Sequence, residues 1–284
     1  MKIKQDWHIH SEYSCDEACL RMEDLIAEAE QLGIKEYGIS DHLHTNYNMP
    51  DIANSKKHYD TIISKNPSLK EKFHFGIEVS CVSEWELDKI RRGDYQGNVT
   101  YGLREGGPVN AKAAIAVDRE YIGQMGIEYV IGGVHWPLYC SFDKDSLLKD
   151  YHRQYMFLAL HENVDILAHY LWWNQGACPN AANPFADFSG VPALMKQELA
   201  LALKQNNCAF ELNLGAILQA ADITDRFKRE YLEYAAEIQS MGVNLAIGSD
   251  CHERHYSNTD FELSSKMLEE AGIDFDNNIF HISK

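Results

Sequence analysis

The chain has 284 residues and a formal net charge of −17, because 43 acidic side chains stand against 26 basic ones. Such an acidic chain, without runs of lysine and arginine, offers no track for a phosphodiester backbone, and we expect no long nucleic acid as a partner. No stretch approaches the roughly 20 apolar residues that cross a bilayer, and the first residues hold no apolar signal core, which indicates a soluble cytoplasmic protein without a membrane partner.

The first predicted element is a strand that ends in Asp6-Trp7-His8-Ile9-His10. Successive side chains of a strand point to opposite faces, so His8 and His10 project the same way and can chelate one ion. A helix is predicted over residues 21–33, where apolar residues recur at helical spacing and Gly33 suits a left-handed C-cap.

The same unit of strand, loop and helix recurs along the rest of the chain. Short apolar runs predict buried strands near residues 36–40, 73–80, 127–134, 164–169, 208–213 and 244–249. Helical spacing predicts helices near residues 111–125, 144–161, 191–205 and 223–241. Strands that alternate with helices form a parallel sheet, although this pattern alone does not separate a closed barrel from an open doubly wound sheet. Turn-forming residues predict loops that shape a substrate pocket at 88–108 and 172–192.

Histidine and carboxylate residues gather where several of these strands end. The motifs are Asp6-Trp7-His8-Ile9-His10, Ser40-Asp41-His42, Gly76-Ile77-Glu78, Gly133-Val134-His135, Ala168-His169 and Gly248-Ser249-Asp250-Cys251-His252. Side chains from strand ends throughout the chain must meet at one point to act together, which favours closure of the sheet. We therefore expect residues 1–284 to form a single barrel domain of seven strands, with its active site at the C-terminal strand ends.

The residue types in these motifs predict a metal centre. A single buried histidine is more often a hydrogen-bonded core residue than a ligand, but many imidazoles and carboxylates at one barrel mouth would leave costly unpaired groups without a cation. Such donors suit zinc, manganese and iron alike. His44, two residues after His42, is either a neighbour of the ligands, a substrate contact or a surface histidine. The core interpretation is kept for the histidines outside strand ends: His58, His74, His152, His161, His255 and His281.

The seven cysteines add nothing to this centre. Their odd number and the absence of CxxC spacing suggest neither a disulfide framework nor a thiolate zinc site. We expect reduced and mostly buried thiols at Cys15, Cys19, Cys81, Cys140, Cys178, Cys208 and Cys251.

With Ser14-Cys15-Asp16 added, the motifs from Asp6 to His252 resemble those of the polymerase and histidinol phosphatase (PHP) superfamily. The resemblance implies a distorted seven-stranded (βα) TIM-like barrel with a trinuclear metal centre that hydrolyses phosphoesters. It also implies three ligand sets: His8, His10, Glu78 and Asp250 for the first ion, Glu78 as a bridge to a second ion on His135 and His169, and Asp16, His42 and His252 for the third. Asp6 and Asp41, which precede ligands, either accept hydrogen bonds that orient imidazoles or act as caps and turn residues.

This centre of two or three divalent ions predicts a phosphorylated substrate. Three divalent ions outweigh the carboxylates of Asp16, Glu78 and Asp250, so the pocket would be positive on an acidic protein. A hydroxide that bridges the first two ions, with its pKa lowered towards roughly 7, would attack phosphorus in line. Arginine suits the phosphate oxygens that are not on metal, although an arginine is more often a solvated helix residue. The candidates are Arg104, Arg119, Arg153 and Arg226.

Glu211-Leu212-Asn213, on the sixth predicted ligand strand, resembles a further signature of the family. Asn213 either lines the pocket or forms a buried hydrogen-bonded pair with Glu211. Dedicated histidinol phosphatases of the superfamily follow this signature with small polar residues and an arginine. Leu214-Gly215-Ala216-Ile217 follows here instead, which argues against histidinol phosphate as the substrate.

The sequence therefore predicts a metal-dependent hydrolase of the phosphatase type, histidinol-phosphatase-like, that acts on a small phosphomonoester. Two alternatives stay open: a phosphoesterase or exonuclease that acts on nucleotides or nucleic-acid ends, and a non-catalytic metal-binding regulator. An amidohydrolase on a similar barrel is disfavoured, because it needs a bridging lysine and no ligand strand end presents one.

Overall fold

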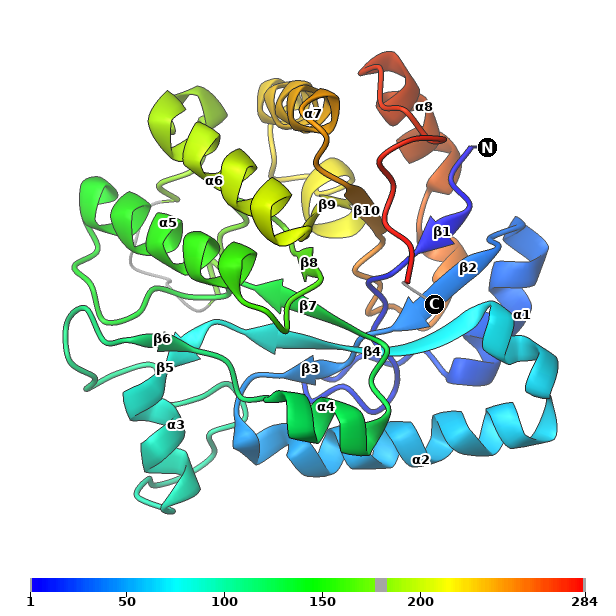
Figure 1. The fold of residues 1–284 in the computed structure, drawn as a ribbon, viewed down its shortest axis with the longest axis horizontal. Helices are drawn as coiled ribbons and strands as arrows, with labels where there is room; N and C mark the ends of the chain where they lie inside the picture. The colour runs from blue at the N-terminus through cyan, green and yellow to red at the C-terminus, as the bar shows by residue number, and fades with distance from the viewer. Residues whose placement is uncertain (1, 177–182, 283–284) are drawn as a thin grey trace.

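A computed structural model describes residues 2–176 and 183–282 of the chain. Seven parallel strands follow one another in a single hydrogen-bonded path (Figure 1). In path order they are β1 (Gln5–Asp6), β2 (Glu36–Ile39), β4 (Phe73–Ser80), β7 (Tyr129–Gly133), β8 (Ile166–Leu167), β9 (Ala209–Asn213) and β10 (Leu245–Gly248). The path nearly closes because the segment after β1 returns to β10, where the Trp7 amide donates to Ile247 O at 2.8 Å. This arrangement confirms the predicted seven-stranded TIM-like barrel.

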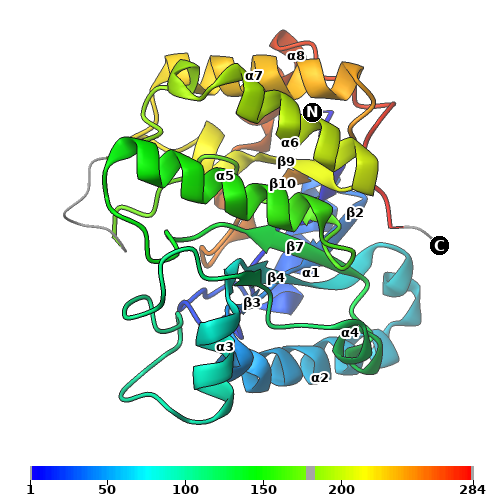
Figure 2. The same ribbon diagram turned by 60° about the vertical axis from the view of Figure 1, so that its left-hand side comes forward.

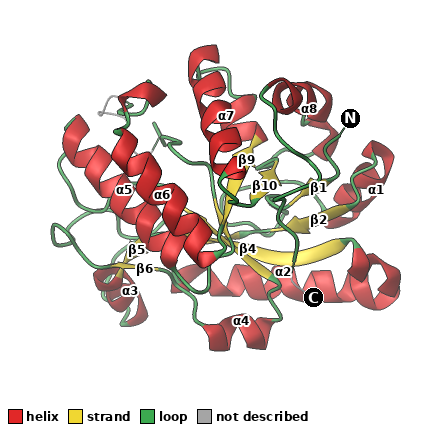
Figure 3. Cartoon of the chain, turned by 45° about the horizontal axis from the view of Figure 1, so that its top comes forward, coloured by secondary structure: helices red, strands yellow, loops and turns green. Residues whose placement is uncertain are grey.

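Helices surround the barrel and cover the outer face of its strands (Figure 2), and Figure 3 shows the strands enclosed by them. The helices are α1 (Met22–Leu32), α2 (Met49–Lys65), α3 (Glu84–Arg91), α4 (Arg119–Met125), α5 (Lys144–Leu160), α6 (Ala193–Asn206), α7 (Asp225–Ser240) and α8 (Phe261–Glu270). The short strand β3 (His42–Leu43) pairs with β4, and β5 (Val82–Ser83) pairs with β6 (Ala113–Ala114). In the part of the chain that the structure describes, no helix is long and apolar enough to cross a membrane.

The barrel interior at the N-terminal end of the strands is filled by an apolar cluster. Its members are Trp7, Tyr129, Ile131, Ile166, Ala168, Ala209, Ala246 and Phe280. The Tyr129 hydroxyl lies 2.7 Å from Trp7 O and 3.0 Å from Ile39 O, so its polar end is satisfied. A Cβ at Gly38 or Gly76 would lie 2.3 Å from an atom of the Tyr129 side chain, which explains why the strands beside this ring carry glycine. The histidine and carboxylate side chains of the predicted centre lie at the opposite, C-terminal end of the strands.

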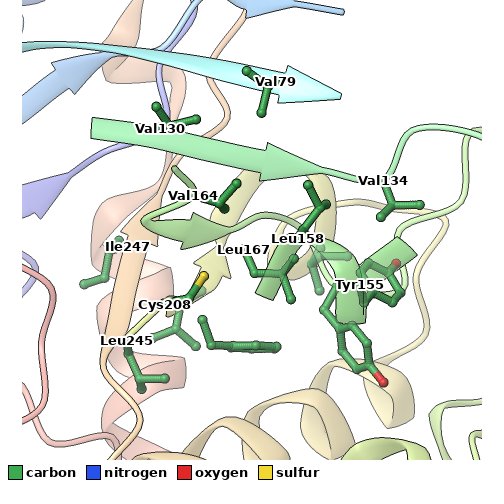
Figure 4. Close-up of a cluster of buried hydrophobic side chains, with 14 of the residues drawn as sticks. Val79, Val130, Val134, Tyr155, Leu158, Val164, Leu167, Cys208, Leu245 and Ile247 are labelled. Carbon is green, nitrogen blue, oxygen red and sulfur yellow. The ribbon is translucent and has the colours of Figure 1, made fainter. Parts of the chain in front are cut away.

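A second apolar layer joins the outer faces of the strands to the helices. Figure 4 shows part of it, with Val130 and Leu167 from strands and Tyr155 and Leu158 from α5. Strands that are buried on both faces read as continuous apolar runs, which is why the sequence locates them well.

The helices differ from the prediction in three places. The predicted helix 111–125 is shorter, because α4 begins at Arg119, and the residues before it form the two-residue strand β6 and an irregular segment at 115–118. Helix α3 extends into the start of the predicted loop 88–108. The sequence pattern predicts neither α2 nor α8, because the buried positions of α2, such as Ile52 and Ile62, are few and separated by polar residues.

The described cysteines are free thiols. Burial raises the pKa of the Cys81 and Cys208 thiols, so both remain protonated near neutral pH. Cys251 is also buried, Cys15 and Cys140 are half-buried, and Cys19 is exposed. Cys178 lies outside the described residues, as does part of the predicted loop 172–192, at 177–182.

Candidate metal centre

Glu78, near the end of β4, is the residue that the C-terminal strand ends share. Its side chain is fully buried. Oε1 lies 3.0 Å from His135 Nε2 and 3.0 Å from His169 Nε2. Oε2 lies 3.1 Å from His8 Nε2 and 2.9 Å from His42 Nδ1. One carboxylate therefore meets imidazoles from four segments that are far apart in the sequence.

His8, His10 and Asp250 form a cluster beside Glu78. The Nε2 atoms of His8 and His10 lie 3.0 Å apart, and Asp250 Oδ1 lies 3.5 Å from the first and 3.3 Å from the second. Donor atoms held about 2.1 Å from one zinc ion are about 3.0 to 3.4 Å apart in octahedral and tetrahedral geometry. The separations in this cluster therefore match those within one coordination sphere.

Asp16, His42 and His252 form a further cluster towards the solvent. Asp16 Oδ2 lies 2.6 Å from His252 Nε2 and 3.2 Å from His42 Nε2. The ring of His10 stacks on those of His42 and His252, with centroids 4.3 Å and 4.1 Å away. Because His42 turns Nδ1 to Glu78 and Nε2 to Asp16, it stands between this cluster and the buried ones.

Buried nitrogen and oxygen atoms that have no hydrogen-bond partner indicate whether these residues fit a metal ion. Among the described residues they include Asp16 Oδ1, His42 Nδ1 and Glu78 Oε2. The last two lie only 2.9 Å apart and still form no hydrogen bond, so their closeness does not satisfy either atom. Leaving such groups unpaired costs about 1–3 kcal/mol each, whereas a divalent cation would satisfy several together. Imidazole and carboxylate are suitable ligands for zinc, manganese and iron, so the residues fit.

Hydrogen bonds from the sixth-strand signature orient two of the ligand candidates. Glu211 Oε1 lies 2.5 Å from His8 Nδ1, a carboxylate behind the imidazole that leaves Nε2 for a metal ion. Asn213 Nδ2 donates to Asp250 Oδ2 at 3.1 Å and to Glu211 Oε2 at 3.0 Å. Asn213 is thus a buried partner of Glu211 and Asp250, and the alternative that it lines the pocket is wrong.

Asp6 and Asp41 hold the chain segments that carry ligands. Asp41 accepts from the Ser11 amide at 2.6 Å and from the Ser11 hydroxyl at 2.8 Å. Asp6 accepts from the Ser249 amide at 2.9 Å and from the Tyr256 hydroxyl at 2.8 Å, and burial raises its pKa to about 6. Among the described residues neither carboxylate bonds to an imidazole: Asp6 also accepts from the His8 amide at 3.2 Å, a local turn contact, whereas the further partner of Asp41 is the distant Ser55 hydroxyl at 2.6 Å.

Burial and charge shift the pKa values of the clustered side chains in opposite directions. Burial raises the pKa values of the Asp250 and Glu78 carboxyls, but the surrounding imidazoles outweigh it and hold both well below the usual range. Burial lowers the pKa of His10 to about 3 and that of His135 to about 4, whereas the facing carboxylates outweigh burial at His8 and His42 and raise their pKa values. Ionised carboxylates and neutral imidazoles are the forms that bind divalent ions, so an ion bound here would displace protons from His8 and His42.

The backbone is unusual at two ligand candidates. Asp250 has a φ of 55° and His169 a φ of 28°, in the left-handed region that side chains other than glycine avoid. Small residues make room beside the ligands, since a Cβ at Gly133 would lie 2.5 Å from Glu78 Oε1 and one at Gly248 would lie 2.6 Å from His8 Cβ.

A cavity of about 490 Å³ lies over the clusters. Tyr101, Arg104, Trp136 and Trp172 contribute to its walls, together with His44. The Arg104 guanidinium lies 3.9 Å from the centroid of the Trp136 ring, and its Nε donates to Tyr101 O at 2.9 Å. Both predicted loop segments therefore contribute to the pocket, and His44, which is 2% exposed, is no surface histidine.

Arg104 is the one of the four arginine candidates that lines this cavity. The other three form ion pairs elsewhere: Arg119 with Glu162, Arg153 with Asp150, and Arg226 with Glu230. These three match the alternative of ordinary helix residues.

Four residues at the site were not named individually from the sequence: Ser80, Trp136, Trp172 and Tyr101, of which the last two lie in the predicted pocket loops. Ser80 lies two residues after Glu78 on the same strand, so the alternation of side chains places both on one face and was a usable signal. Trp136 directly follows His135, whereas Tyr101 lies in an irregular loop and carried no signal.

Comparisons with known proteins agree on the fold. The model of the family described as PHP domain matches residues 6–213. The crystal structure of histidinol phosphate phosphatase from Lactococcus lactis subsp. lactis, complexed with zinc, L-histidinol and phosphate, has a TM-score of 0.60 at 16% identity and covers 95% of this chain and 94% of its own. A candidate histidinol phosphatase from Listeria monocytogenes has a TM-score of 0.60 at 13% identity, with 92% and 99% covered. No curated protein matches the sequence.

Proposed function

The chain belongs to the PHP domain family and is a metal-dependent phosphoesterase, and we propose that it hydrolyses a phosphomonoester of a small molecule. The observation that carries the proposal is the buried Glu78 carboxylate, which meets imidazoles on both oxygens while Oε2 forms no hydrogen bond. Buried carboxylate and imidazole atoms suit cations, and cations bound at the bottom of the cavity attract a phosphate dianion.

We assign two or three divalent ions to the three clusters. His8, His10 and Asp250 with Glu78 would hold the first, His135 and His169 with Glu78 the second, and Asp16, His42 and His252 the third. Ions bound there would polarise the phosphoryl group and make hydroxide available near neutral pH. Zinc is supported by the zinc in the Lactococcus lactis structure, and manganese and iron suit the same donors.

The side chains of the cavity walls position the substrate. The Arg104 guanidinium packs on the Trp136 ring, and both side chains line the cavity. This contact holds a planar cation where it can donate hydrogen bonds to phosphate oxygens that are not bound to the ions. The rings of Trp136 and Trp172 offer apolar contact to the alcohol part of the substrate and keep water from it.

Size and charge favour a small substrate over a polymer. A cavity of about 490 Å³ lies within the range of small-molecule sites. The net charge of −17 opposes the approach of a long phosphodiester chain.

A nucleotide or a nucleic-acid end is the second candidate substrate. The observation that favours it is the aromatic wall of Tyr101, Trp136 and Trp172, because aromatic side chains stack on bases of any sequence.

Metal analysis of protein purified without chelator, followed by a phosphate-release assay, tests the proposal. The substrates are p-nitrophenyl phosphate, histidinol phosphate, and nucleoside monophosphates and bisphosphates. We expect bound divalent ions and release of phosphate from small phosphomonoesters, and we expect Glu78→Ala and His8→Ala to abolish release. His281→Ala, an exposed histidine on the opposite end of the barrel, is the control. Protein that takes up no ion, or a loaded protein that cleaves nothing in the panel, contradicts the proposal, and turnover of nucleotides alone favours the second candidate.

A further inference from the structure

Ser80, at the end of β4, lies between two imidazoles that face the same cavity. Its Oγ is 2.7 Å from His135 Nδ1 and 2.7 Å from His44 Nδ1. All three side chains are buried, so water does not replace these contacts. A hydroxyl has one proton, and between two ring nitrogens it donates to one and accepts from the other. The three residues therefore form a directional chain of hydrogen bonds.

The hydrogen bonds through Ser80 can run in either of two directions. The ring that accepts the Ser80 proton has no proton on Nδ1, so its proton lies on Nε2, whereas the other ring donates to Ser80 from Nδ1. The position of the proton on His135 decides the direction of both hydrogen bonds and the position of the proton on His44.

His135 Nε2 faces the metal centre, where it lies 3.0 Å from Glu78 Oε1. Without an ion, this nitrogen donates to the carboxylate, His135 Nδ1 accepts from Ser80, Ser80 accepts from His44 Nδ1, and His44 Nε2 is left without a proton. With an ion on His135 Nε2, every step reverses, because the ring proton must lie on Nδ1. His44 then carries its proton on Nε2.

His44 Nε2 is the end of the chain that a ligand meets. It is buried and has no hydrogen-bond partner among the described residues. The His44 side chain lines the cavity beside Tyr101 and Trp136, with ring centroids 5.4 Å from each. Since Nδ1 is turned to Ser80, Nε2 is the nitrogen available to a molecule in the cavity.

We propose that an ion held by His135 sets the direction of the His135–Ser80–His44 chain, so that His44 presents an N–H donor to an oxygen of the bound phosphoryl group. Ion binding and substrate recognition are thereby coupled through Ser80. The identity of the ligand rests on the proposed function, whereas the reversal of the chain does not. His44 is a substrate-binding residue in this scheme and Ser80 a positioning residue.

Nitrogen NMR of ring-labelled histidines tests the reversal directly. We compare the zinc-loaded protein with the protein stripped by chelator, and assign the His44 signals by their loss in His44→Gln. We expect the proton of His44 on Nε2 with zinc and on Nδ1 without it. A proton on Nδ1 in the zinc-loaded protein, or the same tautomer in both states, overturns the proposal.

Binding of inorganic phosphate to the zinc-loaded protein, measured by calorimetry, tests the donor. We expect His44→Phe, which keeps a ring beside His42, to bind phosphate about 10- to 100-fold more weakly, as expected for the loss of one hydrogen bond to a charged group. We expect Ser80→Ala to weaken binding several-fold with the zinc content unchanged. His281→Phe is the control and should bind as the wild type.

The outcomes separate this inference from the proposed function. Unchanged phosphate affinity in both His44→Phe and Ser80→Ala overturns the inference, even if the wild type hydrolyses phosphomonoesters. If the wild type cleaves no phosphomonoester, the proposed function fails, while the tautomers of His44 still decide whether the chain reverses. If Ser80→Ala loses zinc, the NMR comparison on the wild type alone decides.

Discussion

The substitution Glu211→Gln tests the ligand geometry because it removes a charge and keeps the shape of the side chain. Both oxygens of Glu211 accept: Oε1 lies 2.5 Å from His8 Nδ1, and Oε2 accepts from the His169 amide at 2.6 Å and from Asn213 Nδ2 at 3.0 Å. Glutamine has a single acceptor oxygen. If that oxygen faces His169 and Asn213, the amide NH₂ faces His8 Nδ1 and drives the proton of His8 onto Nε2, the nitrogen proposed to hold an ion. If the glutamine oxygen faces His8 instead, the NH₂ group points at the His169 amide and at Asn213 Nδ2, which are both donors.

The expected magnitude follows from the loss of this oriented partner. Replacing the group behind a ligating imidazole typically lowers metal affinity by about 10- to 100-fold, or roughly 1.4 to 2.7 kcal/mol. We expect a loss of this size in zinc affinity, measured by competition with a chromophoric chelator on protein that has been stripped and reloaded. The secondary structure, followed by circular dichroism, should stay as in the wild type.

Glu128→Gln is the matched control. Glu128 Oε2 lies 3.1 Å from His74 Nδ1, so it forms the same kind of carboxylate–imidazole pair, but at the N-terminal end of β4. We expect its zinc affinity to match the wild type. If Glu211→Gln binds zinc as tightly as the wild type, the assignment of His8 Nε2 as a ligand is refuted. If both variants lose affinity equally, the loss reflects the stability of the barrel and the geometric argument fails.

Three further predictions concern metal removal, the cavity wall and the barrel interior. Chelation should lower the midpoint of thermal unfolding by about 10 °C if the ions are present at roughly 1,000 times their Kd, and calorimetry that finds no shift would contradict binding at the buried clusters. Arg104→Ala should raise KM for a phosphomonoester about 10-fold. Arg119→Ala removes only a surface ion pair and should leave steady-state kinetics unchanged. Equal KM values for the two variants would exclude a phosphate contact by Arg104. Gly76→Ala should destabilise the fold by about 1–3 kcal/mol or more in urea unfolding, because its Cβ would lie 2.3 Å from the Tyr129 ring. Gly123→Ala lies in a helix and its Cβ would meet no atom within 4 Å, so it should not destabilise the fold. Equal stabilities of the two variants would refute the packing argument.

The regular part of the barrel could be predicted from the sequence because its signals are local. A predicted strand over 73–80 coincides with β4, and the predicted helix 144–161 ends one residue beyond α5. Helix α2 escaped prediction because its buried stripe is narrow, and the start of the predicted helix 111–125 became β6 because pairing with β5 outweighed local preference. Local preference decides an element only where no distant partner competes.

The types and directions of the candidate ligands were determined by the sequence itself. His8 and His10 lie beyond β1, which is shorter than the predicted strand, but they flank the isolated parallel bridge of Ile9 with Cys251, and their Nε2 atoms come 3.0 Å apart as the predicted alternation requires. Tertiary structure alone decided the partners: Glu211 stands behind His8 across 203 positions, Ser80 joins His44 to His135, and Arg104 reaches the cavity by lying on a tryptophan. The reason is physical, because hydrogen bonds and ring contacts depend on distances of a few ångströms between distant segments, and closure of the barrel sets those distances.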